Sequence, residues 1–500
     1  MSVACGQRQT SCRRKTRRLL SQHATEQTHV SETEALFGVL RQSADAGCAA
    51  AIEGAVTNAA DHELCRVNAL AFASKNKLDE ERTIAAFLHA ARLGLFELSW
   101  NVLCPDCGGV LDAGTTLKTV NHDEYSCALC AAGYKPTLDE MVEVTFTVNP
   151  RVRRIAGHDP DTLPEVEYYR QIFWSSGMDL PDDLAASLAE FTIDSIEVPP
   201  GAKAVLSVQL PEGIVIAFDP VTHSRQIVTV TGGPTRDKQA LSIVFSKVRA
   251  PLGTIETIEM LPGPLRLSIE NHTNQRVLPA LWISSDALHH LLGKRRPFLT
   301  AKRLLTNQTF RDLYNTDTLD PDQRLKITSL TFLFTDLKGS TALYERVGDL
   351  VAYDLVRQHF GVLHEIVASE AGAVVKTIGD AVMATFSTPD RALAAALRMR
   401  EAMTRINAER GNEDLLLKIG IHEGPCLAVR LNHSQDYFGQ TVNIAARVQG
   451  LASSRSIFVT EPVVEDPKTA KILQSQSLRP SMRQAALRGI ADETTVFEIP

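Results

Sequence analysis

Two pairs of cysteines, each pair separated by two residues, constrain the fold of this chain more than any other feature. Cys104 and Cys107 form the first pair, and Cys127 and Cys130 form the second after nineteen intervening residues. Each pair presents two thiolates from one tight turn, and two such turns supply the tetrahedral four-sulfur shell that zinc prefers. A shell closed by four sulfurs leaves no position for a catalytic water. The spacing therefore predicts a four-cysteine zinc ribbon that holds one structural zinc.

Two other uses of these cysteines, a redox switch or a nucleic-acid contact, stay open on spacing alone. Residues 100–130 contain one lysine, Lys118, and no arginine, so the positive charge that binds a phosphate backbone is missing there. The remaining five of the nine cysteines are scattered, unlike those of a secreted disulfide framework. We therefore expect a protein of a reducing, cytoplasmic compartment that binds no nucleic acid.

The length of 500 residues allows about three domains. The chain has 52 Lys and Arg against 59 Asp and Glu, so its net charge of −7 gives no general attraction to nucleic acid or anionic membranes. No stretch approaches the roughly 20 apolar residues of a membrane helix, so we expect no membrane span. Residues 1–33 begin with a basic cluster and lack an apolar period, which predicts a basic flexible arm.

Changes in hydrophobic period and in turn residues divide the remainder into six segments. Apolar residues recur at helical spacing around Phe87, whereas runs such as AVLSVQL and GIVIAF alternate between Pro/Gly turns. The predicted segments are a helical module at 34–99, the zinc ribbon at 100–150, a linker with a helix at 151–195, an antiparallel β-sandwich regulatory domain at 196–285, a helical connector at 286–326 and a catalytic domain at 327–500.

Strands and helices alternate over residues 327–500. TSLTFLF predicts a strand, Thr341–Ser369 a helix, and AVVKTIGDAVMATF a hairpin that turns at Gly379-Asp380. LLLKIGIHEGPCLAVRL predicts a second hairpin, bent at Gly424-Pro425, and a helix follows from about residue 442. Paired hairpins with helices packed on one face indicate an α+β fold of the ferredoxin-like kind. The whole chain is thus predicted to be multidomain.

Two aspartates lie at strand ends in this domain. Asp336 follows the strand TFLF, and Asp380 lies in the turn of the first hairpin. Two such carboxylates suit a pair of Mg²⁺ (or Mn²⁺) ions on a triphosphate, because these ions take one or two carboxylates together with phosphate oxygens. The turn after Asp336 opens a helix, so its backbone N–H groups can hold phosphate oxygens. This turn consists of Leu337, Lys338, Gly339, Ser340 and Thr341.

Taken alone, this segment is more simply interpreted as an ordinary strand-to-helix turn with capping side chains. Four further polar residues favour a nucleotide-binding site over an ordinary turn. Lys376 can donate a hydrogen bond to N1 of adenine, and Asp436 can accept one from the exocyclic amine. Asn443 and Arg447 lie at i and i+4 on one helix face, where they can orient a ribose and meet charge that builds on a phosphate.

With these motifs present, residues 327–500 resemble the catalytic domain of the class III adenylate/guanylate cyclases. The resemblance implies that Asp336 and Asp380 hold two metal ions per active site, and that Asn443 and Arg447 stabilise the transition state. The implied reaction converts ATP to 3′,5′-cyclic AMP and pyrophosphate. A catalytically silent, nucleotide-binding regulator is the alternative, and the intact aspartates and Arg447 argue against it.

The same resemblance bears on specificity and assembly. Guanylate cyclases of the family usually carry Glu and Cys at the positions of Lys376 and Asp436, so this pair implies ATP, with GTP as the alternative. Arg488 stands where a triphosphate-binding lysine is common. Active sites of the family form between two chains, so a homodimer with two equivalent sites is implied.

The upstream part also carries a resemblance. The stretches WNVLCPDCGG, VEVTFTVNP and FRDLY resemble an uncharacterised amino-terminal region found before cyclase domains in some bacterial proteins. That region brings no known ligand. We therefore expect residues 34–326 to respond to a regulatory ligand, a partner protein or the metal itself, and the sequence leaves open which of these it is.

Overall fold

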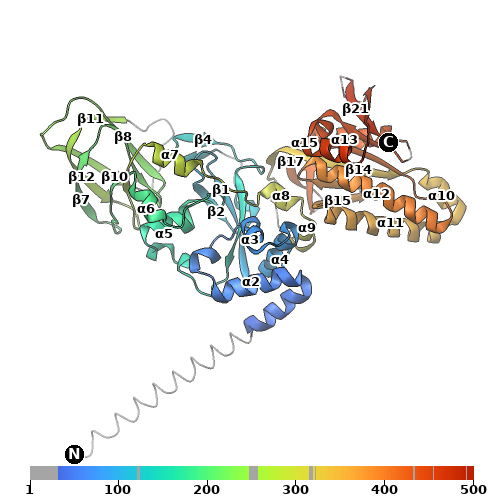
Figure 1. Ribbon diagram of the computed structural model, residues 1–500, viewed down its shortest axis with the longest axis horizontal. Helices are drawn as coiled ribbons and strands as arrows, with labels where there is room; N and C mark the ends of the chain where they lie inside the picture. Colours follow the sequence, from blue (N-terminus) through green and yellow to red (C-terminus); the bar gives the residue numbers. More distant parts are fainter. Residues whose placement is uncertain are drawn as a thin grey trace, which may run out of the picture.

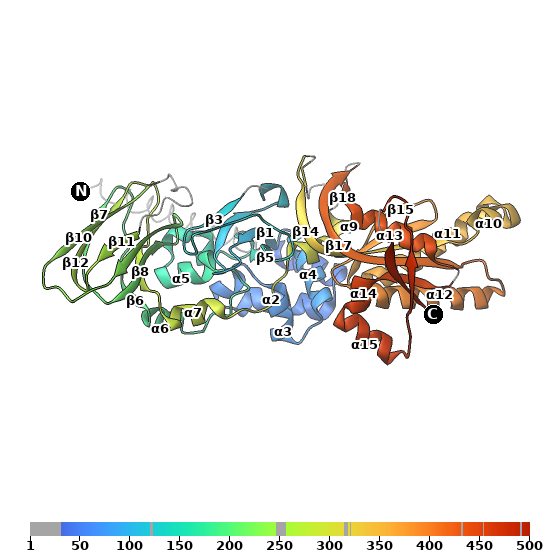
Figure 2. The same cartoon turned by 90° about the horizontal axis from the view of Figure 1, so that it is seen from above.

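The computed structural model describes residues 32–120, 124–246, 257–314, 319–320, 322–431, 434–453, 455–490 and 493–500. The predicted arm at 1–33 lies almost wholly outside these residues. Figures 1 and 2 show a β-rich lobe at one end of the molecule, helices with a small sheet in the middle, and the C-terminal lobe at the other end. Within the described ranges, no helix combines the length and the apolar character needed to cross a bilayer.

Short helices open the described chain, and they fall where the apolar period predicts them. They are a helix at 32–43, α2 (Ala46–Asn58), η1 (Asp61–Leu64), α3 (Ala69–Asn76) and α4 (Glu80–Arg92). On α4, Ile84, Phe87 and Leu88 are buried. Asp79 caps the start of α4 by accepting from the Arg82 backbone N–H, which satisfies one of the free donors of the first turn.

A three-stranded antiparallel sheet packs on these helices in the order β2-β1-β5. Its strands are β1 (Phe96–Leu103), β2 (Val110–Gly114) and β5 (Val142–Val148). The rings of Phe87 on α4 and Phe146 on β5 stack with centroids 5.0 Å apart. The cysteine pairs lie beyond the sheet, next to η2 (Leu117–Thr119), β3 (Tyr125–Cys127) and β4 (Ala132–Tyr134).

Two sheets form the β-rich lobe, in the orders β10-β12-β7 and β11-β9-β8-β13-β6, and they share one core. The strands are β6 (Thr192–Ser195), β7 (Lys203–Leu210), β8 (Gly213–Asp219), β9 (Ser224–Val230), β10 (Gln239–Phe245), β11 (Thr257–Met260), β12 (Gly263–Asn271) and β13 (Ala280–Ile283). The prediction of an antiparallel sandwich at 196–285 is wrong in part, because β10 pairs with β12, and β11 with β9, in parallel. Alternation along a strand predicts its buried face but not the direction of its neighbour.

Short helices link the lobes. They are η3 (Ala156–His158), η4 (Pro160–Thr162), α5 (Glu165–Tyr168), the π-helical turn η5 (Tyr169–Phe173), α6 (Leu184–Ala189), α7 (Asp286–Gly293), α8 (Ala301–Leu305) and α9 (Gln308–Tyr314). Figure 1 places α8 and α9 between α4 and the C-terminal lobe.

The C-terminal lobe is built on a sheet in the order β15-β16-β14-β17-β19-β21-β20, with β18 paired to β17. The strands are β14 (Leu325–Leu337), β15 (Gly372–Ile378), β16 (Ala381–Phe386), β17 (Leu417–Leu431), β18 (Ser434–Phe438), β19 (Ile457–Thr460), β20 (Ser481–Ala485) and β21 (Thr494–Ile499). The helices are α10 (Ser340–Val347), α11 (Asp349–Ser369), α12 (Pro389–Arg410), α13 (Gln440–Leu451), α14 (Glu461–Glu465) and α15 (Pro467–Ser475).

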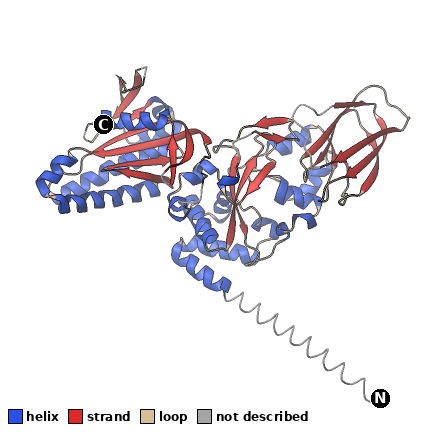
Figure 3. Ribbon diagram, turned by 180° about the vertical axis from the view of Figure 1, so that it is seen from behind, coloured by secondary structure: helices blue, strands red, loops and turns tan. Residues whose placement is uncertain are grey.

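Side chains of β14 alternate between two cores. Leu333 packs with α11 and α12, the long helices that Figure 3 shows side by side along the sheet. Phe332 and Phe334 belong to the opposite core, which contains Ala445 of α13. The strand is therefore buried on both faces, which explains why every residue from 330 to 335 is buried. The expectation that helices pack on one face only is wrong, because the sequence of one strand does not reveal what covers its second face.

Two further predictions in this lobe are wrong. Gly424-Pro425 does not turn the chain, since β17 runs through it and Gly424 pairs with Leu330 at an irregularity in the β14 register. An irregular site tolerates a proline, which has no N–H to donate to the ladder. The helix expected over Thr341–Ser369 is interrupted at Gly348, whose φ of +79° lies outside the helical region.

One hydrophobic core crosses from the middle of the molecule into the C-terminal lobe. Phe310 of α9 meets the Trp100 ring edge-on, with centroids 5.9 Å apart. On the other side, Phe332 of β14 packs at 5.6 Å from the ring of Tyr437 of β18. All four residues belong to one cluster of buried side chains. The C-terminal lobe therefore does not bury this face of its sheet by itself.

Candidate active site

The structure brings the two predicted metal-binding aspartates together. Asp336 lies near the end of β14, and Asp380 lies in the turn from β15 to β16, where Gly379 has a φ of +63°. Thr335 pairs with Val382, so the two aspartates flank the same point of the sheet. Burial and then the negative charge of Asp380 raise the pKa of the Asp336 carboxyl above its ordinary value. Repulsion from Asp380 therefore adds to the cost of burying the Asp336 charge.

The carboxylate of Asp380 fits a cation ligand for a second reason. Its Oδ2 is buried and has no hydrogen-bond partner among the described residues. A buried carboxylate oxygen without a partner is costly, and a divalent cation beside it would remove both this cost and the repulsion from Asp336. The donor set of two carboxylates suits hard ions such as Mg²⁺ or Mn²⁺.

The turn after Asp336 has the expected strand-to-helix form. Leu337 is buried, Lys338 is exposed, Gly339 has a φ of +73°, and α10 begins at Ser340. The backbone N–H of Lys338 donates to Leu416 O at 2.8 Å, which fixes the start of the turn. Thr341 is the second residue of α10, and its side chain lies outside the described part of the chain.

Lys376 and Asp436, sixty residues apart in sequence, form an ion pair between Lys376 Nζ and Asp436 Oδ2. The lysine side chain is 44% exposed and the aspartate side chain 8% exposed. The other oxygen, Oδ1, accepts from the Tyr437 backbone N–H at 2.9 Å, which holds the carboxylate still. The pair thus presents a solvent-accessible donor beside a fixed acceptor.

The helix α13 carries Asn443 and Arg447 on one face, with Asn443 exposed and Arg447 partly buried. The turn that contains Arg488 lies beside them, because a Cβ added at Gly489 would come 3.5 Å from Arg447 Nη2. The backbone next to Arg488 therefore lies beside the Arg447 guanidinium.

Within one chain, Arg447 and the two aspartates predicted to bind metal lie on different sides of α13. Gln449 lies beside Asp336 and acts to lower the pKa of that carboxyl. Successive helix residues turn by about 100°, so Arg447, two positions earlier, projects in nearly the opposite direction from Gln449. No hydrogen bond or ion pair among the described residues joins Asp336 or Asp380 to Arg447.

Sequence reasoning missed two groups near the aspartates, Gln449 and His359. His359 is fully buried in α11, and neither ring nitrogen has a partner among the residues described. Burial lowers the pKa of His359 to about 4, while the charge of Asp380 acts in the opposite direction. A single histidine in an amphipathic helix gives no sequence signal for this proximity.

His422, which lies on β17, is held by a neighbouring strand end. Its Nδ1 lies 2.7 Å from Thr460 Oγ1, and burial lowers the pKa of the ring to about 4. The ring is therefore neutral near pH 7 and bonded within the fold, as expected of a structural residue.

The four predicted zinc ligands converge. The ligand atoms of Cys104, Cys107, Cys127 and Cys130 all lie within 4.8 Å of one another. Two sulfur–sulfur distances, 3.7 Å for Cys104 to Cys130 and 3.6 Å for Cys107 to Cys127, match the edge of about 3.8 Å that follows from Zn–S bonds of about 2.3 Å. The first turn is closed by the Gly108 N–H, which donates to Cys104 O at 2.9 Å.

More than half of the chain, residues 30–312, matches a family model described as a family of unknown function (DUF5939). The chain belongs to this family. Residues 323–497 match the adenylate and guanylate cyclase catalytic domain, so the C-terminal lobe of this family member is a nucleotidyl cyclase domain. Both matches confirm the resemblances drawn from the sequence.

Curated relatives agree with the match of residues 323–497 to the cyclase catalytic domain. An adenylate cyclase of Anabaena cylindrica is 27% identical over 185 residues, which are 34% of this chain and 36% of the relative. Adenylate cyclase 2 of Rhizobium meliloti (strain 1021) is 28% identical over 298 residues, 56% of this chain and 78% of the relative. Among solved structures, that of the adenylyl cyclase CyaB from P. aeruginosa covers 36% of this chain and 96% of its own, at 19% identity and a TM-score of 0.32. The chain therefore spans about a third of the Anabaena protein and over three quarters of the Rhizobium protein.

Proposed function

We propose that the chain is an adenylate cyclase that converts ATP to 3′,5′-cyclic AMP and pyrophosphate. The observation that carries this proposal is the ion pair of Lys376 with Asp436. Adenine offers an acceptor at N1 and a donor at its exocyclic amine, which match a lysine donor and a carboxylate acceptor. Guanine offers the reverse pattern at these two positions, so the pair favours ATP over GTP.

Divalent cations held by Asp336 and Asp380 would neutralise the triphosphate and acidify the ribose 3′-hydroxyl. The buried, unpartnered Oδ2 of Asp380 supports this role. The backbone N–H groups at the start of α10 face the same end of β14 and are suited to phosphate oxygens.

In the proposed reaction, the ribose 3′-oxygen attacks the α-phosphorus in line. A P–O bond forms to the 3′-oxygen, the P–O bond to the β-phosphate breaks, and the 3′-proton passes to a carboxylate or to water. Asn443 orients the ribose, and the guanidinium of Arg447 donates to the oxygens that gain charge in the pentavalent transition state. Arg488 binds the leaving pyrophosphate.

A head-to-tail homodimer completes this site. Arg447 projects away from Asp336 within one chain, so the transition-state arginine comes from the partner. Ile378 and Phe438 support such an interface, because both are exposed apolar side chains, at 52% and 65%, and each lies two residues from a base-reading residue. Burial of these side chains by the second chain would favour association.

Asp336→Ala and Arg447→Ala should each lower cyclic AMP formation by at least about a hundredfold, because each removes charge stabilisation from the transition state. A one-to-one mixture should regain about a quarter of wild-type activity, since half of the randomly exchanged dimers are mixed and each mixed dimer has one intact site. Cyclic AMP is measured after subunit exchange, with each variant alone as the control. A mixture as inactive as its components would contradict the shared site.

Replacing Lys376 by Glu and Asp436 by Cys should lower the preference for ATP over GTP by about tenfold or more, because the hydrogen-bonding pattern is then reversed. The measurement is kcat/KM for each nucleotide. The matched control is Arg483→Glu with Glu498→Cys, which removes an ion pair at the opposite edge of the same sheet. An unchanged preference in the Lys376/Asp436 variant would show that these residues do not read the base.

The converging cysteines support one structural zinc per chain, with no catalytic role. The purified chain should contain about one zinc, and Cys107→Ser should lower both the zinc content and the melting temperature, because three sulfurs hold the ion less well. Zinc is measured by elemental analysis and melting by calorimetry. Cys48→Ser is the matched control, since Cys48 is equally buried but lies outside the cluster. A chain without zinc that melts at the same temperature as the chain with zinc would contradict the proposal.

A further inference from the structure

One buried arginine of the connector holds the backbone next to both base-reading residues. Arg311 of α9 is 6% exposed. Its Nη2 donates to Val375 O at 3.2 Å and to Gln435 O at 3.0 Å. These carbonyls belong to the peptide groups that immediately precede Lys376 and Asp436.

A peptide group is planar, so its carbonyl oxygen and the Cα of the next residue move as parts of one rigid unit. Arg311 therefore constrains the Cα positions of Lys376 and Asp436 at the same time. The strands that carry them, β15 and β18, are not neighbours in the sheet, and no backbone hydrogen bond joins them among the described residues. Arg311 supplies the link that the sheet itself does not.

A β-bulge in β15, directly before Lys376, affects the direction in which the Lys376 side chain points. Val374 pairs with Ala384 and Lys376 with Met383, so Val375 is the extra residue. A bulge changes the direction of the side chains beyond it. Helix α9 binds both sides of the bulge, because the Val374 N–H donates to Gln308 Oε1 at 2.7 Å and Val375 O accepts from Arg311.

The same connector holds β18 on the other side of Asp436. The Tyr437 hydroxyl lies 3.3 Å from Leu305 O at the end of α8, to which it donates. Asp436 therefore sits between two residues, Gln435 and Tyr437, that are both tied to the connector.

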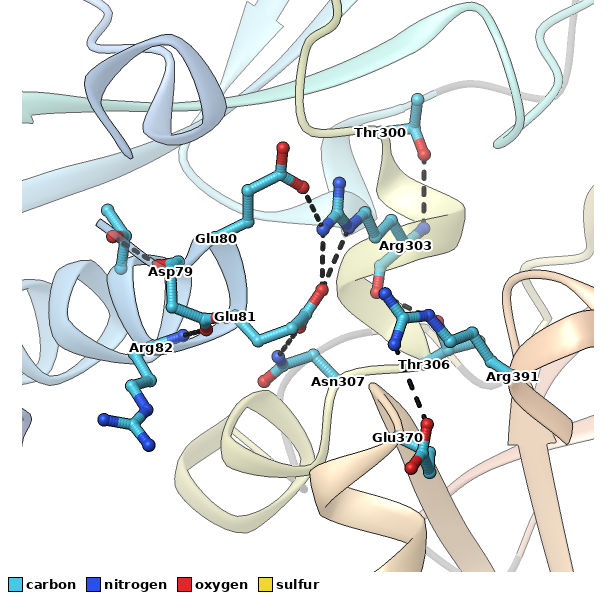
Figure 4. A network of polar contacts seen from close by, with 11 residues as sticks. Asp79, Glu80, Glu81, Arg82, Thr300, Arg303, Thr306, Asn307, Glu370 and Arg391 are labelled. Carbon is cyan, nitrogen blue, oxygen red and sulfur yellow. Dashed lines mark hydrogen bonds and ion pairs between the residues drawn. The ribbon is translucent and has the colours of Figure 1, made fainter. Parts of the chain in front are cut away.

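Contacts to the amino-terminal region set the position of α8 and α9 in turn. Figure 4 shows Arg303 of α8 reaching Glu80 and Glu81 of α4, with Asn307 bonded to Glu81. The two Arg303 contacts from Nη2 are each 2.7 Å long. Phe310 packs against Trp100 on the same side. The placement of Arg311 thus depends on residues outside the cyclase domain.

We propose that Arg311 is a positioning residue for base selection, which sets the spacing of Lys376 and Asp436 and links that spacing to the amino-terminal region. This inference rests on the proposed function, in which that pair reads adenine. It assigns Arg311 no contact with ATP, with the metal ions or with the reacting phosphate.

Arg311→Ala should lower the ratio of kcat/KM for ATP to that for GTP by about tenfold to a hundredfold, as expected when reading groups are misplaced by a fraction of an ångström to 1 Å. The effect should appear mainly in KM. The Mg²⁺ concentration for half-maximal activity should stay unchanged, because α9 makes no described hydrogen bond to Asp336 or Asp380. Equilibrium binding of non-cyclisable ATP and GTP analogues should show the same loss of preference.

The matched control is Arg276→Ala in the amino-terminal region. Arg276 is also buried, at 8% exposed, and its Nη2 also donates to two backbone carbonyls, of Pro160 and Leu163. A purely structural loss would affect both variants alike. Arg311→Lys keeps the charge and a donor, so it should recover part of the ATP preference.

The proposal is supported if Arg311→Ala loses its preference for ATP over GTP while Arg276→Ala keeps the wild-type preference. An Arg311→Ala preference within about twofold of wild type, or an equal shift in Arg276→Ala, overturns it. Should Arg311→Ala fail to fold, Gln308→Ala, which removes the acceptor of the Val374 N–H at the bulge, decides the same question by the same criterion. Absence of cyclic AMP from the wild-type chain would instead contradict the proposed function, so the two failures are distinguishable.

Discussion

The burial of α8 and α9 between the amino-terminal region and the sheet of the cyclase domain is the constraint on which the rest of the structure depends. Phe310 contacts Trp100 on one side of the connector. On the other side, Arg311 and Leu305 bond to the strands that carry Lys376 and Asp436, the pair proposed to read the base. The connector is therefore part of the core of both regions. Contacts of α8 with α4, and of α8 and α9 with β15 and β18, therefore form a continuous path from α4 to the strands of Lys376 and Asp436.

The charged side chains of the candidate active site, and not the net charge of the chain, bear on the binding of a phosphate ligand. The net charge of −7 gives no hint of a phosphate ligand, yet Arg447 lies beside the turn that contains Arg488, and Asp336 and Asp380 are suited to hold cations. Burial raises the pKa of Asp336 most, and repulsion from the negative charge of Asp380 adds to this rise. A cation at the proposed metal site would relieve this repulsion, which favours metal binding.

The sequence predicts local motifs such as the cysteine pairs, and the cyclase resemblance predicts pairs that lie far apart in sequence, such as Lys376 and Asp436. Contacts that belong to neither group could not be predicted. The cysteine pairs converge as their spacing predicts, and the Gly379-Asp380 turn brings Asp380 beside Asp336. The ferredoxin-like label for the cyclase domain and the six segment boundaries stay predictions. Gly424-Pro425 was misread as a turn because local composition does not show that β14 extends the pairing of β17 past it.

The role of Arg311 has no local signal for a related reason. Its two acceptors lie 64 and 124 residues away, and both are backbone carbonyls that carry no side-chain signature. An arginine within FRDLY looks like any charged helix residue until tertiary contacts bury it. The same holds for Gln449, which is brought to Asp336 only by the packing of α13 on β14 and β17.

The central claim is that the chain makes cyclic AMP. The most direct measurement supplies the purified full chain with Mg²⁺ and equal concentrations of ATP and GTP, and quantifies both cyclic nucleotides and pyrophosphate by mass spectrometry. The account predicts cyclic AMP and pyrophosphate in equal amounts, with cyclic GMP as a minor product. Predominant cyclic GMP, or bound nucleotide with no cyclic product, would contradict it.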